Sequence, residues 1–121
     1  MPRQILDEAR IHPAIRDKVA ALNADIVKEV MDAVTVHDVV IVGMRQNPMP
    51  RHAKKLLDMD SIKYQYLEYG SYLQGWRKRT ALKMWTGWPT FPMVFVRGTF
   101  IGGAEDLARL KHSGELQKML A

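Results

Sequence analysis

The sequence reads WPTFPMVFV from Trp88 to Val96, with two prolines followed at once by an apolar run. Proline fixes its own φ and has no backbone N–H, so Trp88–Pro92 predicts a rigid turn. The residues Met93–Val96 predict a short strand, and Gly98 predicts a turn into a further strand at Thr99–Ile101. This part of the chain therefore predicts a rigid turn that leads into a β-hairpin.

Helices and strands alternate along the rest of the chain. Val39–Val42 is a run of β-branched residues ended by Gly43, which is typical of a strand buried on both faces. Residues 62–69 alternate well enough for another strand, and a helix is predicted to begin at Asn47–Pro48. Further helices are expected over residues 73–85, 104–111 and 113–121. This order of elements indicates one α/β domain.

The amino-terminal region carries one apolar stripe at spacings of three and four. The stripe consists of Ile15, Val19, Leu22, Ile26 and Val30. It predicts a single helix over residues 12–34, with Pro13 in the first turn. Residues 1–11 are expected to be a poorly ordered lead-in. We therefore expect residues 1–35 to be an added segment packed on the same domain, which itself covers residues 36–121.

Composition excludes several classes of function. The chain of 121 residues contains no cysteine, which rules out disulfides, thiolate catalysis and cysteine-ligated zinc or iron–sulfur sites. The histidines lack metal-ligand spacing, so no metal site is predicted. No apolar run approaches the roughly 20 residues of a membrane span, and residues 1–10 lack a signal-peptide core, so a soluble cytoplasmic protein is expected. The net charge of +5 is moderate, and the short basic run Arg77–Arg79 is accompanied by no dedicated nucleic-acid-binding motif.

Three segments in a fixed order carry a family resemblance. They are the helix start at Asn47–Leu57, the stretch from Arg79 through Trp88–Pro92, and Ile101–Leu107 followed closely by Gly114–Leu116. Over residues 36–121 the chain resembles a glutaredoxin, and Trp88–Pro92 is most similar to the monothiol branch. The resemblance implies a thioredoxin-like α/β fold, a four-stranded mixed sheet flanked by helices, with the amino-terminal helix as an addition. It also implies a cis peptide bond before Pro92.

The resemblance also places the family's redox motif at the start of the helix after the first strand. Unpaired N–H groups and the helix dipole lower the pKa of a thiol at such a position. In this sequence Asn47 stands at the first cysteine position and Pro50 at the second. Neither can act as a sulfur nucleophile, so no catalytic residue for thiol–disulfide exchange is predicted. Iron–sulfur cluster binding is not expected either, because the family's route uses that first cysteine.

The family's glutathione groove uses backbone and charge rather than sulfur, and its positions can be matched individually. They are Arg79, Thr90, Phe91, Pro92, Gly103, Ala104, Glu105 and Asp106. The resemblance implies that Arg79 binds the glycyl carboxylate and that the backbone at Phe91 pairs with the cysteinyl unit. The amides of Ala104 and Glu105 would hold the γ-glutamyl carboxylate, and the acid of Glu105 or Asp106 would hold its ammonium.

Each of these features also has a purely structural interpretation. Glu105 and Asp106 complement the dipole of any helix start, residues 77–79 suit a solvated helix face, and Gly102–Gly103 suits a turn. The tryptophans Trp76, Trp85 and Trp88 suit packing.

Several functions therefore stay open. The first is a non-catalytic binding module whose groove holds glutathione, a peptide or a protein partner. The alternative is a glutathione-dependent electron-transfer or disulfide oxidoreductase role, with the sulfur supplied by the ligand or partner. The third is an assembly role, including a homodimer, through the added helix and the basic face. Nucleic-acid binding ranks last.

Overall fold

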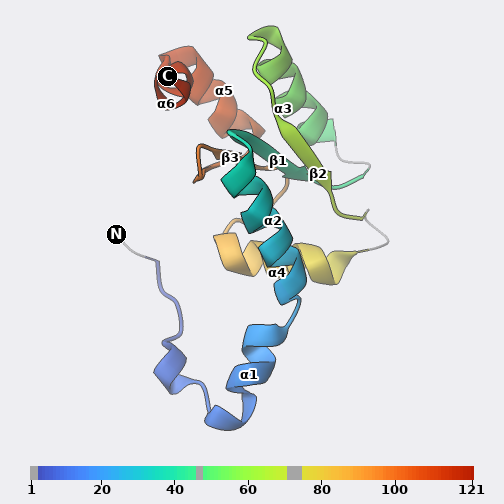
Figure 1. Ribbon diagram of the computed structural model, residues 1–121, viewed down its shortest axis with the longest axis vertical. Coiled ribbons are helices and arrows are strands. Elements are labelled where there is room, and N and C mark those ends of the chain that lie inside the picture. Colours follow the sequence, from blue (N-terminus) through green and yellow to red (C-terminus); the bar gives the residue numbers. More distant parts are fainter. Residues whose placement is uncertain (1–2, 46–47, 71–74) are drawn as a thin grey trace.

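The computed structural model describes residues 3–45, 48–70 and 75–121. Its elements follow one another along the chain as drawn in Figure 1. They are η1 (Glu8–Arg10), α1 (Pro13–Ala21), α2 (Ala24–Val36), β1 (Val39–Gly43), α3 (Pro48–Met59), β2 (Gln65–Glu68), α4 (Trp76–Thr86), β3 (Met93–Val96), β4 (Thr99–Gly102), α5 (Ala104–Ser113) and α6 (Glu115–Leu120).

The strands form one mixed sheet of four in the order β2-β1-β3-β4. β1 runs parallel to β2, and Val40 lies opposite Gln65. β3 is antiparallel to both of its neighbours, with Phe95 opposite Val40 in β1 and opposite Phe100 in β4. The predicted four-stranded mixed sheet is therefore confirmed.

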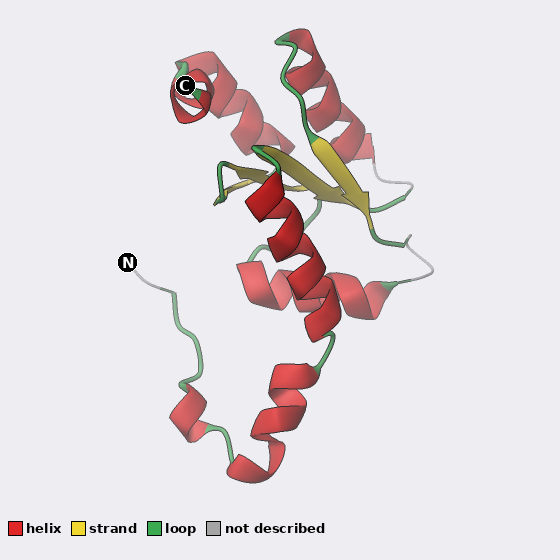
Figure 2. Ribbon diagram, viewed as in Figure 1, coloured by secondary structure: helices red, strands yellow, loops and turns green. Residues whose placement is uncertain are grey.

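Helices cover both faces of this sheet (Figure 2). Successive strand residues point to opposite faces, so β1 contributes to two separate cores. Val40 and Val42 pack with Ile26 of α2 and Leu82 of α4. Val39 and Ile41 pack on the other face with residues of α3, α5 and α6, namely Ala53, Leu57, Leu107 and Leu116. Since every residue of β1 is buried, the strand was correctly predicted to be covered on both sides.

The amino-terminal region differs from its prediction. The prediction of a single helix over residues 12–34 is wrong, because the helix is interrupted at residues 22–23, between α1 and α2. Asn23 adopts φ +51°, a left-handed conformation that asparagine tolerates better than most residues. The lead-in also contains the 3₁₀ helix η1, where the backbone N–H of Ala9 donates to the Asp7 carboxylate at 3.1 Å.

The break divides the apolar stripe between two environments. Ile26 and Val30 of α2 are buried, but α1 has no buried residue, and Ile15, Val19 and Leu22 are exposed. Figure 1 shows why: α1 lies beyond the far end of α2, away from the sheet. Only the second half of the stripe contributes to the core.

Other element boundaries shift by a few residues. β2 covers Gln65–Glu68 rather than residues 62–69, and α5 continues to Ser113. The predicted cap Asn47 and the predicted helix start at residue 73 lie outside the described residues. Within the described ranges, no helix combines the length and apolar character needed to cross a bilayer.

Candidate functional site

A cavity of about 300 Å³ lies between the turn before β3 and the start of α5. Its lining residues come from three places in the sequence. They are Met49 from α3, the group Trp88, Thr90, Phe91 and Pro92 from the turn, and Gly103, Ala104, Glu105 and Asp106 from the helix start. The structure therefore brings together all the predicted groove residues except Arg79.

The β3–β4 hairpin places the turn beside the helix start. β3 begins directly after Pro92, and Val94 lies opposite Gly102 at the end of β4. A side-chain atom added at Gly103 would consequently lie 3.5 Å from the carbonyl oxygen of Pro92. The peptide bond between Phe91 and Pro92 is cis, the isomer that the resemblance implied.

The start of α5 combines hydrogen-bond donors with carboxylates. The backbone N–H of Gly103 donates to Oδ2 of Asp106 at 2.9 Å, which caps the helix. Asp106 is half-buried and also lies 3.8 Å from Arg109, whereas Glu105 is exposed. The first amides of a helix have no intrahelical acceptor and favour an anion. Amides and carboxylates side by side suit a zwitterionic α-amino-acid group.

Gly102 is needed for this arrangement. Its φ is +106°, and a Cβ there would approach the Asp106 carboxylate carbon to 2.7 Å. Gly103 has an ordinary negative φ of −100° and more space around it. In the predicted Gly102–Gly103 turn, the first position therefore requires glycine, whereas the second could hold a residue with a Cβ.

Trp88 forms a wall of the cavity and contains an unusual buried group. Its indole Nε1 is buried and has no hydrogen-bond partner among the described residues. The ring packs edge-on against Phe100, with centroids 5.6 Å apart and an interplanar angle of 76°. Sequence reasoning assigned Trp88 to packing and passed over Met49. No local pattern identifies either residue as a wall, because tertiary contacts place them there.

The remaining predicted residues lie outside the cavity lining. Arg79 is only 7% exposed, and its Nη1 donates to the carbonyl of Tyr69 at 3.2 Å. Pro50, at the second cysteine position, is buried against Gly43, where an added Cβ would lie 2.8 Å from its Cγ. The role of Arg79 toward a glycyl carboxylate thus stays a prediction.

Two tyrosines of the β2 region carry the clearest shifts in acidity. Burial, followed by the neighbouring Glu68 carboxylate, raises the pKa of Tyr66 to about 12. Burial also raises the pKa of Tyr69, helped by its hydroxyl donating to Glu29 of α2 at 2.6 Å. Both phenols stay protonated at neutral pH and therefore supply no phenolate nucleophile. The Tyr69 hydroxyl connects the end of β2 to α2, whereas Tyr66 bonds to Glu68 within its own strand.

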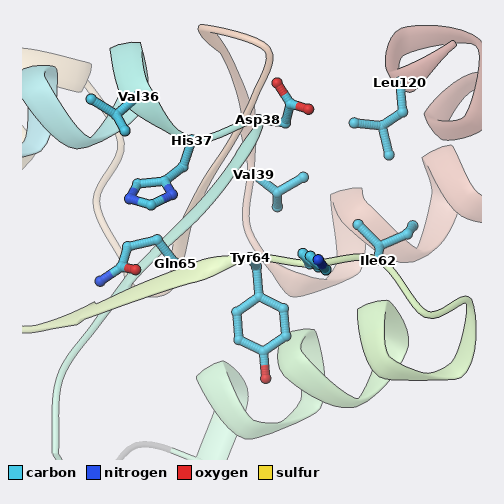
Figure 3. Close-up of a pocket in the computed structure, with 9 residues that line it drawn as sticks. Val36, His37, Asp38, Val39, Ile62, Tyr64, Gln65 and Leu120 are labelled. Carbon is cyan, nitrogen blue, oxygen red and sulfur yellow. The ribbon is translucent and has the colours of Figure 1, made fainter.

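A larger cavity, of about 570 Å³, lies at the opposite end of β1 and is lined by none of the predicted site residues. In Figure 3, His37 and Gln65 lie on one side of it, and Ile62 and Leu120 on the other. Asp38 pairs with Arg97 at 3.4 Å. Because the lining mixes acidic and basic side chains, it offers no uniform charge with which to select a ligand. Across residues 3–45, 48–70 and 75–121, no three metal-ligating side chains form a cluster.

The cavity at the α5 start has no group that could perform thiol exchange. The full chain has no cysteine, so it has no sulfur nucleophile. The side-chain sulfur in the cavity lining belongs to Met49, a thioether. What the residues offer is a turn with a cis peptide bond, a helix start and two carboxylates.

Comparison with known proteins gives a consistent family. The glutaredoxin family model matches residues 39–101. A glutaredoxin-like protein of Dictyostelium discoideum is 43% identical over 94 residues, which cover 78% of this chain and 76% of the relative. Monothiol glutaredoxin-4 of Schizosaccharomyces pombe is 28% identical over 103 residues, covering 82% of this chain but only 41% of that longer protein.

Solved structures give the same answer. The buckwheat glutaredoxin–glutathione complex superposes with a TM-score of 0.71 at 26% identity, covering 82% of this chain and 90% of that one. Oxidised glutaredoxin 2 of Chlamydomonas reinhardtii gives a TM-score of 0.70 at 29% identity, with coverage of 81% and 92%. By sequence and by fold, this cysteine-free chain belongs to the glutaredoxin family.

Proposed function

We propose that the protein is a non-catalytic member of its family, a binding module whose cavity at the α5 start holds glutathione or a peptide with similar ends. One observation carries this proposal: the turn Thr90–Pro92 and the helix start Gly103–Asp106 line a single cavity. A solved relative of the same fold contains glutathione, which supports the choice of ligand. The absence of cysteine is why we propose binding without thiol exchange.

The proposed contacts follow from the chemistry of each wall. The amides of Ala104 and Glu105 would receive the γ-glutamyl carboxylate, since helix N-termini favour anions. The carboxylates of Glu105 and Asp106 would hold the neighbouring ammonium. The backbone at Phe91 would pair with the extended middle of the ligand as an added strand does. We retain Arg79 as the proposed partner of the glycyl carboxylate.

Titration calorimetry with reduced glutathione tests the proposal. We expect saturable heat from the wild type, and Glu105→Gln should weaken the affinity roughly fivefold, about 1 kcal/mol for an exposed charged contact. Glu115→Gln is the matched control, because Glu115 is also an exposed acid in the first turn of a helix. The Glu115 variant should bind as the wild type does.

Two outcomes would contradict the proposal. Absence of heat from the wild type at millimolar glutathione would remove glutathione as the ligand. Equal affinities of the Glu105 and Glu115 variants would show that the Glu105 carboxylate does not hold the ammonium, contrary to the proposed contacts.

The family relationship supports a second candidate, an oxidoreductase role in which the ligand or partner supplies the sulfur. A glutathione–disulfide reductase assay separates the two. We expect no turnover above the rate without protein, because exchange needs an attacking thiolate and the chain supplies none. Turnover that scales with protein concentration would favour the second candidate.

A further inference from the structure

A second groove lies on the other side of Trp88. It has a volume of about 420 Å³ and runs between the amino-terminal residues 3–5 and the carboxy-terminal end of α4. Arg3 and Ile5 form one wall, and Lys83, Met84 and the Trp88–Pro89 pair form the other. We refer to this feature as the arm–α4 groove. It lies partly in the segment that precedes the region matched by the family model, residues 39–101.

The amino-terminal wall is held against α4 by Arg3. Its Nη2 donates to the carbonyl of Trp85 at 3.3 Å, near the end of the helix where cations are favoured. Its guanidinium also lies so close to Gly87 that a Cβ there would collide with it. Gly87 has φ +75° and ends the helix. The Arg3 side chain therefore ties the amino-terminal residues to the end of α4. α1 has no buried residue and lies away from the sheet (Figure 1).

Apolar side chains on both walls are exposed to solvent. Ile5 is 71% exposed and Met84 is 68% exposed, although both line the same groove. Trp88 and Pro89 add further apolar surface between them. Exposed apolar side chains gathered around one open hollow suit contact with a partner's apolar side chains.

The charge of the groove has one sign. Arg3 and Lys83 line it, and none of its described lining residues is acidic. Neither cation forms an ion pair within the described part of the chain: Arg3 donates to a carbonyl, and Lys83 lies 5.9 Å above the Phe91 ring. α4 itself contains Arg77, Lys78, Arg79 and Lys83 and no carboxylate. The complement of this surface is negatively charged.

We infer that the arm–α4 groove binds an acidic peptide segment of a partner protein, with an apolar side chain inserted between Ile5 and Met84 and carboxylates paired with Arg3 and Lys83. Two cations beside exposed apolar side chains complement a peptide that carries both carboxylates and an apolar side chain. The inference is independent of glutathione binding, because Trp88 is the one residue that the two cavities share among their described lining residues.

The test is fluorescence anisotropy with a labelled peptide of about eight residues that alternates glutamate and leucine, measured without glutathione. The wild type should bind it saturably and should not bind a peptide that alternates lysine and leucine. Lys83→Glu should weaken binding about tenfold, and Met84→Ala several-fold. Lys78→Glu is the matched control, because it makes the same charge change on an exposed position of α4 outside the groove. It should change the affinity by less than about twofold.

Three results would overturn the inference. They are no saturable binding of the acidic peptide, equal loss in the Lys83 and Lys78 variants, and equal binding of the basic peptide. Sedimentation of the protein alone and binding to phosphatidylserine vesicles identify other occupants. If Lys83→Glu abolishes self-association or vesicle binding while peptide binding is unchanged, the groove serves a second copy or a lipid surface instead. Thermal unfolding of each variant verifies that the fold is intact.

Discussion

Replacing Ile26 with alanine should lower the free energy of unfolding by about 2–5 kcal/mol, the range for truncating a fully buried isoleucine. Ile26 is 2% exposed and packs in the core between α2, α4 and the sheet. The loss combines the transfer free energy of the removed methyl groups with the cavity that remains after them. Urea denaturation followed by circular dichroism measures the effect.

The same substitution at Ile15 provides the control. Ile15 belongs to the same sequence stripe but is 48% exposed on α1, so Ile15→Ala should change the stability by less than about 0.5 kcal/mol. The two variants remove the same atoms from the same residue type. Similar losses in both would show that α1 packs against the body in solution, contrary to the position described above.

Gly102→Ala should have the second large effect, on stability and on ligand binding together. The residue adopts φ +106°, which alanine populates poorly, and such a conformation costs about 1–3 kcal/mol. The added methyl would also displace Asp106, whose carboxylate caps α5 and lines the cavity. We expect a lower melting temperature and, if glutathione binds as proposed, roughly tenfold weaker affinity.

Gly103→Ala separates conformation from crowding. At φ −100° an alanine is not strained, and the nearest atoms to its Cβ lie 3.5 Å or more away. This variant should retain the wild-type melting temperature to within about 2 °C, corresponding to less than about 0.5 kcal/mol. If the two variants were equally destabilised, the positive φ at Gly102 would not be the cause.

The sequence predicted the fold well where periodicity and special residues agree. The β-branched run before Gly43 and the proline turn before Met93 are local signals, and both strands lie where they were expected. The helix break at Asn23 was missed because the stripe from Ile15 to Val30 continues through it without a change of spacing. The one local signal for the break is Asn23 itself, because asparagine adopts the left-handed conformation more readily than most residues.

The sequence predicted those parts of the cavity that are formed by turns of the backbone. The Thr90–Pro92 turn and the Gly103–Asp106 helix start were both matched in sequence and both line the cavity. Arg79 was matched equally well, yet its guanidinium lies against the Tyr69 carbonyl. The position of the charged group of a long side chain depends on the loops that surround it, and a short sequence motif does not specify those loops. The same reason explains why Trp88 and Met49 were not recognised as walls.

The pairing of Val94 with Gly102 holds the turn before β3 beside the start of α5. A hairpin, a turn and a helix cap therefore form most of the cavity wall, and Met49 is the described residue that the segment Asn47–Pro50 adds to it. If the cavity binds glutathione as proposed, recognition in this chain is separate from thiol chemistry, because the chain has no thiol.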